Sequence, residues 1–309
     1  MKAKGLIVIF FCLISEILLA QQLPLFSQQT FNRFGFNPAC AGSKNSVDAL
    51  LTHRIHMLNF PGAPTTQLLT VSAPWQLINM GFGVRVLNDN IGVSNSLSVN
   101  FASNYVLTFG AGKLSLGLEM GVDQYAVDWN QLVRYNEQDD VIPTTEASIT
   151  TPNAAFGLFY TTENWYFGYS VQNLIASRLA FAGAESNYSA RKFATHYLNV
   201  GGVKKINDYF QVEPYLLIKG TNSIWQMDLG SYLVLKQKFG AGLAYRTKDA
   251  FVLTLKLELP EKFYLGYSYD VRLNTLNPYT NSSHEFMLGY YHKLLEPVRK
   301  KAIHPRYYF

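Results

Sequence analysis

Hydrophobic and polar residues alternate with a period of two along much of this chain. In residues 113–123 every even-numbered position is Leu, Met or Val, and every odd-numbered position is Lys, Ser, Gly, Glu or Asp. Residues 239–246, 251–258 and 263–270 repeat the alternation with few exceptions. Because successive side chains of a strand point to opposite faces of a sheet, each segment predicts a strand with one apolar face and one small or polar face.

Such segments follow one another along the chain after residue 46. They are about ten residues long, the length that a tilted strand needs to cross a membrane, whereas the strands of a soluble β-sandwich have about 5–6 residues and a charged outward face. We therefore predict an all-β fold, an antiparallel transmembrane β-barrel of the outer membrane with about 14 strands, an even number as such barrels require. The predicted strands are 47–58, 65–73, 79–88, 94–108, 113–125, 153–162, 164–172, 193–206, 208–219, 225–236, 238–247, 249–258, 261–269 and 282–293.

The lengths of the connections indicate how the barrel is oriented. The three longest connections are 126–152, 173–192 and 270–281, which are the fifth, seventh and thirteenth in order. Barrels of this class have short periplasmic turns and longer extracellular loops. If the N-terminus lies in the periplasm, all odd-numbered connections face outside, and we expect these three loops at the cell surface.

The first twenty residues have the pattern of a secretory signal peptide. Lys2 and Lys4 precede an apolar stretch that ends at Ala20, a small residue suited to cleavage. The stretch is shorter than the roughly 20 residues of a spanning helix, and it contains Glu16 near its end. We predict a signal peptide over 1–20, an N-terminal periplasmic or lumenal segment over 21–46, a β-barrel over 47–293 and a C-terminal periplasmic tail over 294–309.

The composition favours a membrane barrel over a soluble domain. Charged residues make up 15% of the chain, against about 25% in soluble domains, and aromatic residues another 15%. The net charge of +5 becomes +4 when Lys2, Lys4 and Glu16 are removed with the signal peptide. This small excess comes without a basic stripe, so no nucleic-acid partner is expected. Cys40 is the one cysteine after residue 20, which allows neither an internal disulfide nor a cysteine zinc site.

The sequence offers no catalytic constellation. It contains no G-x-S-x-G, H-E-x-x-H or C-x-x-C motif, so we assign no catalytic, metal-binding or cofactor-binding residue. The histidines are scattered, and His53 and His56 fall on opposite faces of one predicted strand. Charges predicted to face the lumen are compatible with a substrate channel and with a plugged, salt-bridged lumen. These charges are Arg85, Glu119, Asp123, Asp228, Arg246, Lys256, Glu258 and Asp270.

Several short motifs occur in a fixed order from residue 26 to residue 309. They are FSQ at 26–28, NPACAGS at 37–43, GAPTTQ at 62–67, NDNIG at 88–92, YSYD at 267–270, SSHE at 282–285 and PRYYF at 305–309. Together they resemble the PorP/SprF family of Bacteroidota, from which Cys40 departs because an aromatic residue is more usual there. The motif positions that we single out are Asn37, Pro38, Gly42, Ser43, Gly62, Ala63, Pro64, Asn88, Asp89, Gly92, Asp270, Ser283, His284 and Glu285.

The resemblance implies an integral outer-membrane accessory of the type IX secretion system. Such proteins support the export or cell-surface attachment of specific secreted proteins with C-terminal sorting domains, such as gliding adhesins. The expected partners are outer-membrane lipid, one such secreted protein and other components of type IX secretion. The alternative is an outer-membrane channel for small solutes or hydrophobic compounds, while an enzyme would need a nucleophile with partners that the sequence does not offer.

The residue types of the motifs at 62–67 and 88–92 also predict turns, independently of the family resemblance. Gly62 and Pro64 form a rigid, tight loop, and Asp89 with Gly92 is typical of a turn. Both fall in odd-numbered connections, which are predicted to face outside. Rigid external loops could hold a partner, or they could simply close hairpins.

Overall fold

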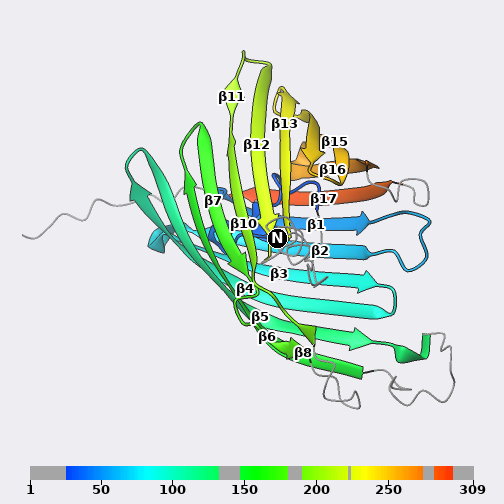
Figure 1. Cartoon of the computed structure of the whole chain (residues 1–309). Helices are drawn as coiled ribbons and strands as arrows, with labels where there is room; N and C mark the ends of the chain where they lie inside the picture. Colours follow the sequence, from blue (N-terminus) through cyan, green and yellow to red (C-terminus); the bar gives the residue numbers. More distant parts are fainter. Residues whose placement is uncertain (1–25, 132–146, 180–189, 222–223, 274–281, 295–309) are drawn as a thin grey trace, which may run out of the picture.

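The computed structural model describes residues 26–131, 147–179, 190–221, 224–273 and 282–294. In this part of the chain, fourteen long strands form one closed antiparallel sheet. Figure 1 shows the first strand, β1, beside the last, β17. The first and last strands pair with each other, from Ser46 opposite Lys293 to Ile55 opposite His284. The prediction of a fourteen-stranded antiparallel barrel is therefore confirmed. The predicted signal peptide and C-terminal tail lie outside the described residues.

The fourteen barrel strands lie close to the predicted segments. They are β1 (Ser46–Ile55), β2 (Thr65–Trp75), β3 (Met80–Ile91), β4 (Ser94–Phe109), β5 (Gly112–Val127), β6 (Ala147–Thr161), β7 (Trp165–Gln172), β10 (Thr195–Gly202), β12 (Phe210–Gly220), β13 (Trp225–Leu235), β14 (Phe239–Arg246), β15 (Ala250–Glu258), β16 (Phe263–Arg272) and β17 (Ser283–Lys293). Short pieces accompany them: β8 (Arg178–Leu179) pairs with β9 (Ala190–Arg191), and β11 (Lys204–Lys205) pairs with β12.

The largest differences from the predicted boundaries concern β6 and β10. β6 begins six residues earlier than predicted, at Ala147, because it pairs with β5 as far as Val127. β10 ends at Gly202 rather than continuing to 206, and the amide of Val203 donates to the Asn164 carbonyl instead. Such ends depend on which partner the backbone meets, and the side-chain pattern does not encode that partner.

The alternation of side chains divides each strand between an outer and an inner face. On β5, Leu118 and Met120 are 56% and 68% exposed on the outer face, whereas Glu119 is 2% exposed on the inner face. The outer face therefore presents an apolar band, as a barrel in lipid requires. Within the described residues, no helix is long and apolar enough to cross a membrane.

The barrel has two distinct ends. At the end that we call the loop end, β1 finishes at Ile55 and β17 begins at Ser283; at the turn end, β1 begins at Ser46 and β17 finishes at Lys293. The connections at the turn end are short, as at Lys236 (φ 49°), whereas the longest connections, between β5 and β6 and between β7 and β10, lie at the loop end. The prediction places the loop end outside the cell.

The N-terminal segment, residues 26–44, lies inside the barrel. Two short 3-10 helices shape it, η1 (Arg33–Gly35) and η2 (Pro38–Cys40). Its first residues contact the strands at the loop end, and Ala41 contacts β3 and β4 near the turn end. Further 3-10 turns are η3 (Gln76–Ile78), η4 (Trp129–Gln131) and η5 (Pro260–Lys262).

Candidate functional site: the filled lumen and the loop end

The start of the N-terminal segment binds directly to acidic side chains of the wall. The backbone amides of Ser27 and Gln28 donate to the two carboxylate oxygens of Glu285, at 2.7 and 2.9 Å. The Ser27 hydroxyl donates to Asp270 Oδ1 at 2.7 Å. Charge-assisted hydrogen bonds of this kind are stronger than neutral ones, so β16 and β17 fix the direction of the segment at the loop end.

Two buried arginines hold the same carboxylates in place. Arg54 of β1 contacts Asp270 at 2.6 Å and Glu285 at 3.1 Å. Arg246 of β14 contacts Asp270 at 2.8 Å and Asp228 of β13 at 3.1 Å. All of these side chains are at most 8% exposed, and buried charges of this kind are tolerated only when they are paired.

His56 extends this charged cluster toward the loops. Its Nε2 lies 2.6 Å from an Arg272 nitrogen, and its Nδ1 lies 3.1 Å from the Ser283 hydroxyl. Burial, followed by the charges of Arg54 and Arg272, lowers the pKa of His56 to about 3. His56 is therefore a neutral hydrogen-bonding group at neutral pH. In the described residues no group of three or more His, Cys, Asp or Glu side chains could hold a metal.

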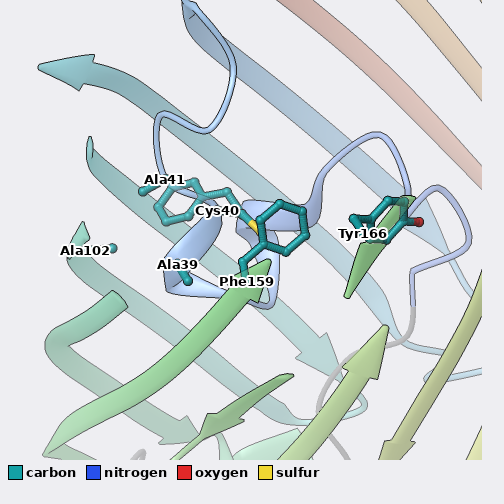
Figure 2. Packing of buried hydrophobic residues seen from close by; sticks show 7 residues of the cluster. Ala39, Cys40, Ala41, Ala102, Phe159 and Tyr166 are labelled. Atoms are coloured by element: carbon teal, nitrogen blue, oxygen red, sulfur yellow. The ribbon is translucent and has the colours of Figure 1, made fainter. Parts of the chain in front are cut away.

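The other half of the N-terminal segment packs through small apolar residues. Ala39, Cys40 and Ala41 are at most 3% exposed, and they form one cluster with Ala102 of β4 and Phe159 of β6. In Figure 2 the Cys40 sulfur and the Phe159 ring lie against each other. Burial raises the pKa of the Cys40 thiol to about 12, so this cysteine is an apolar filler rather than a reactive group.

Glycines of the wall make room for this half of the segment. A Cβ at Gly117 of β5 would lie 2.3 Å from the Ala39 nitrogen, and one at Gly81 of β3 would lie 2.1 Å from the Ala41 carbonyl oxygen. Gly42 has a φ of +60°, and a Cβ there would lie 2.5 Å from the Ala73 carbonyl oxygen. A side chain at these positions would push the segment off the wall.

The motif around Asn37 builds η2. The Asn37 side chain accepts a hydrogen bond from the Ala39 amide at 3.0 Å and donates to the Leu158 carbonyl of β6 at 3.1 Å. Pro38 occupies the first helical position, where no amide is needed. The Ser43 amide donates to the Cys40 carbonyl at 3.1 Å, while the Ser43 side chain is exposed. This motif thus positions the segment inside the barrel.

The middle of the lumen contains ion pairs between wall strands. Arg85 of β3 bonds Glu119 of β5 across β4, and both side chains are at most 4% exposed. Asp123 of β5 pairs with Lys192, and it also accepts from Asn153 of β6 at 2.9 Å. Lys192 comes from the connection between β9 and β10, so that connection reaches into the lumen.

Two of the predicted lumen charges lie toward the turn end. The Lys256 nitrogen sits 5.1 Å from the ring centres of both Phe31 and Tyr264. Glu258 accepts a hydrogen bond from the Tyr291 hydroxyl at 2.8 Å. Lys256 therefore also touches the N-terminal segment, through Phe31.

The filled lumen leaves little free space. A cavity of about 40 Å³ lies between the segment and the wall, and its polar lining includes Gln28, Arg85 and Lys219. At about 10–15 Å³ per water, this is room for about three water molecules.

The first two loop motifs are joined to each other at the loop end. The Gly92 amide donates to the Gly62 carbonyl at 3.0 Å, and both glycines have positive φ, +56° and +73°. The Ala63 amide donates to the Phe60 carbonyl at 3.0 Å, and this bond closes the turn of the first loop. The two loops therefore form one stiffened unit.

Residues at the loop-end termini of the strands form hydrogen bonds next to these joined loops. Asp89 accepts from the Thr66 hydroxyl at 2.6 Å, while Asn88 accepts from Asn95 at 3.1 Å on the outward face. The Pro64 carbonyl accepts from the His56 amide at 2.9 Å. These bonds tie β2, β3 and β4 together where they leave the predicted membrane region.

The three residues of the last motif point in different directions. Ser283 faces His56, and Glu285 faces the N-terminal segment. His284 faces outward, with its Nδ1 2.9 Å from the Tyr267 hydroxyl. Sequence reasoning did not single out Arg54, Ser27 and Lys192 as contacts. For Arg54 a signal existed, because an arginine on the polar face of β1 must find a partner.

The comparisons with known proteins agree with this architecture. No curated protein sequence matches the chain. Among solved structures it is similar to the CymD monoaromatic hydrocarbon channel, with 11% identity and a TM-score of 0.52 over 89% of this chain and 94% of that one. The toluene transporter TbuX of Ralstonia pickettii has 12% identity and a TM-score of 0.47 over 84% and 92%. At such identities the first likeness concerns the barrel fold alone.

The comparison with protein families identifies the family of the chain as well as its fold. The family model described as "Type IX secretion system membrane protein PorP/SprF" matches residues 18–290. These residues include the filled lumen, the joined loops and all the wall charges described above. The protein is thus an outer-membrane β-barrel, and it belongs to the PorP/SprF family of type IX secretion system membrane proteins.

Proposed function

We propose that this barrel supports the export or surface attachment of one or a few secreted proteins that carry C-terminal sorting domains. The observation that carries the proposal is the N-terminal segment, which fills the lumen of a type IX secretion family barrel. Polar bonds hold the segment at one end and close packing holds it at the other. A protein with this interior is better suited to holding a partner at its surface than to passing a solute.

The loop end offers a surface for such a partner. Phe60 and Ile91 of the joined loops are 43% and 48% exposed, and Leu174 and Ile175 beyond β7 are 47% and 40% exposed. Apolar residues on a stiff, weakly charged rim suit contact with another protein. The stiffness matters because a preorganised surface loses less conformational entropy on binding.

The test compares a deletion strain with strains that carry loop variants. In the deletion strain, we expect surface and culture-medium proteomics to lose a small group of sorting-domain proteins while the rest are exported normally. Phe60→Asn with Ile91→Asn should reproduce this loss while the barrel remains in the outer membrane. Leu77→Asn is the matched control, because Leu77 is 72% exposed at the turn end and should leave export unchanged.

The competing function is a channel for small or hydrophobic solutes. The similar CymD structure is named a monoaromatic hydrocarbon channel. If the deletion strain exports and displays every sorting-domain protein normally, yet loses uptake of a solute that the complemented strain takes up, the channel is the better assignment. Single-channel recordings of the purified barrel would then show conductance without any secretion partner.

A further inference from the structure

The N-terminal segment is held most specifically at its first described residues. Arg246 donates to the Phe26 carbonyl at 3.3 Å and to the Ser27 hydroxyl at 3.1 Å. Arg54 donates to the same hydroxyl at 2.8 Å. These groups lie at the loop end, where β1 and β14 finish. From there the segment runs toward the turn end and enters β1 at Ser46.

We propose that the loop end of the lumen is a peptide-binding site for Ser27-Gln28 of the same chain, and that it places the mature N-terminus on the side of the long loops. The predicted orientation of the loops requires only that β1 begin on the periplasmic side, at Ser46. The N-terminus itself would then lie at the cell surface, in place of the periplasmic position assumed from the sequence. This side assignment needs no knowledge of the secreted partner.

The site has the features of a recognition site for a short peptide. Glu285 accepts two consecutive backbone amides, which any residue could supply. Selection for serine comes from its hydroxyl, which donates to Asp270 and accepts from both arginines. A larger side chain would displace the arginines, and alanine would leave them without this acceptor.

The wall also accommodates the Gln28 side chain. The side-chain nitrogen Nε2 of Gln28 donates to the Glu285 carbonyl at 3.2 Å. A Cβ at Gly266 would lie 1.9 Å from the side-chain oxygen of Gln28, so a larger residue at 266 would force this side chain to shift.

Chain length decides where the N-terminus can reach. If the signal peptide is cleaved after Ala20, as the sequence predicts, five residues (21–25) precede Phe26. Fully extended, they span at most about 17 Å, less than the roughly 30 Å of the hydrocarbon core. They cannot return to the turn end. The side assignment does not rest on the proposed function.

The first experiment places an epitope tag between Gln22 and Leu23 of the full-length protein. Antibody binding is measured on intact and on permeabilised cells, with the same tag at Asn277 and at Asn207 as controls for the loop end and the turn end. We expect the N-terminal tag to behave as the Asn277 tag does. Binding in the pattern of the Asn207 tag would overturn the proposal, whichever side the loops occupy.

The second experiment tests the peptide site itself. A reporter cysteine replaces Gln29 in a Cys40→Ala background, and its reaction rate with a maleimide is measured on purified barrel in detergent. Asp270→Asn with Glu285→Gln should raise the rate about tenfold or more, because the segment loses its charged acceptors. Glu163→Gln with Asp208→Asn removes two exposed turn-end carboxylates, and should change the rate by less than about twofold.

A second variant keeps the test informative if the carboxylate variant does not fold. Ser27→Ala with Gln28→Ala leaves the wall intact and should also raise the rate of the reporter cysteine. If both variants fold, as heat-modifiable gel mobility reports, and both react at the parent rate, the loop end does not bind this peptide. If the deletion strain exports every sorting-domain protein normally while the tag shows a surface-exposed N-terminus, only the proposed function is contradicted.

Discussion

The two halves of the N-terminal segment are held by opposite means. Residues 26–29 meet a charged wall and are fixed by hydrogen bonds to Asp270 and Glu285. Residues 38–42 are held mainly by close packing, with Ala39 0% exposed, and Asn104 adds hydrogen bonds to the carbonyls of Ala39 and Ala41. The first half relies on a few directional bonds, and the second on shape over many atoms.

This difference implies that the two halves fail in different ways. A single lost charge at the loop end leaves partners buried without compensation. A single added methyl near η2 creates a clash that the backbone must absorb. The comparison predicts that the charged half is sensitive to removal of atoms and the packed half to addition of atoms.

The largest effect should come from a lone charge at the loop end. Arg246→Met leaves Asp228 without its arginine and leaves Asp270 with Arg54 alone. It should lower the free energy of unfolding by about 3–5 kcal/mol, measured by urea unfolding in detergent. Arg85→Met with Glu119→Leu removes a whole pair, so its loss should be far smaller. If the paired removal costs as much as the single one, uncompensated charge is not the cause.

A charge on the lipid face of β5 should have the next largest effect. Leu118 is 56% exposed within the apolar band, and Leu118→Arg should cost about 2–4 kcal/mol in lipid bilayers. Gln124→Arg, on the same face beyond the band, should cost about 0–1 kcal/mol. Equal costs would mean that the band does not mark the membrane. Arginine at the neighbouring Ser115 is not a suitable control, because Ser115 is 5% exposed in the filled lumen.

Addition of atoms to the packed half should cost less than loss of a charge. Gly117→Val places a side chain against Ala39 and should cost about 1–3 kcal/mol. Gly240→Ala is the control, because the nearest atom to its new Cβ would be 3.6 Å away. We expect thermal unfolding of purified barrel to separate the two variants, with Gly240→Ala close to the parent. A neutral Gly117→Val would show that the segment can leave the wall.

The barrel could be predicted from the sequence because its signal is local and repeated. Each strand carries its own alternation of apolar and polar residues. The lengths of the connections indicate which end of the barrel carries the long loops. The filled lumen could not be predicted in the same way. Residues 26–44 have no period, and their contacts join positions as distant as Ser27 and Glu285, 258 residues apart. The predicted lumen charges likewise carry no information on which pairs form, since Arg85 meets Glu119 across an intervening strand.

The motif positions show the same limit. The sequence singles out Asn37 and Gly42 only as part of a motif that resembles the family. Their roles, as a cap for η2 and a close approach to β2, depend on the folded wall. Gly62 and Gly92 were assigned to separate turns, and the bond between them emerges only when both loops are placed. Local chemistry predicts a turn, and tertiary contact decides what the turn touches.

The smallest effect should appear as a dependence on pH at the charged half. The pKa of His56 is lowered to about 3, so the unfolded chain binds a proton near pH 6.5 that the folded barrel does not. Stability from this group is therefore complete above about pH 6.5 and is lost progressively as the pH falls toward 3. Between pH 7.5 and 5.5, we expect wild type to lose about 1 kcal/mol more than His56→Asn in urea unfolding. His292→Asn, at an exposed position, should follow wild type, and identical pH profiles for wild type and His56→Asn would show that His56 takes up its proton in the folded barrel as well.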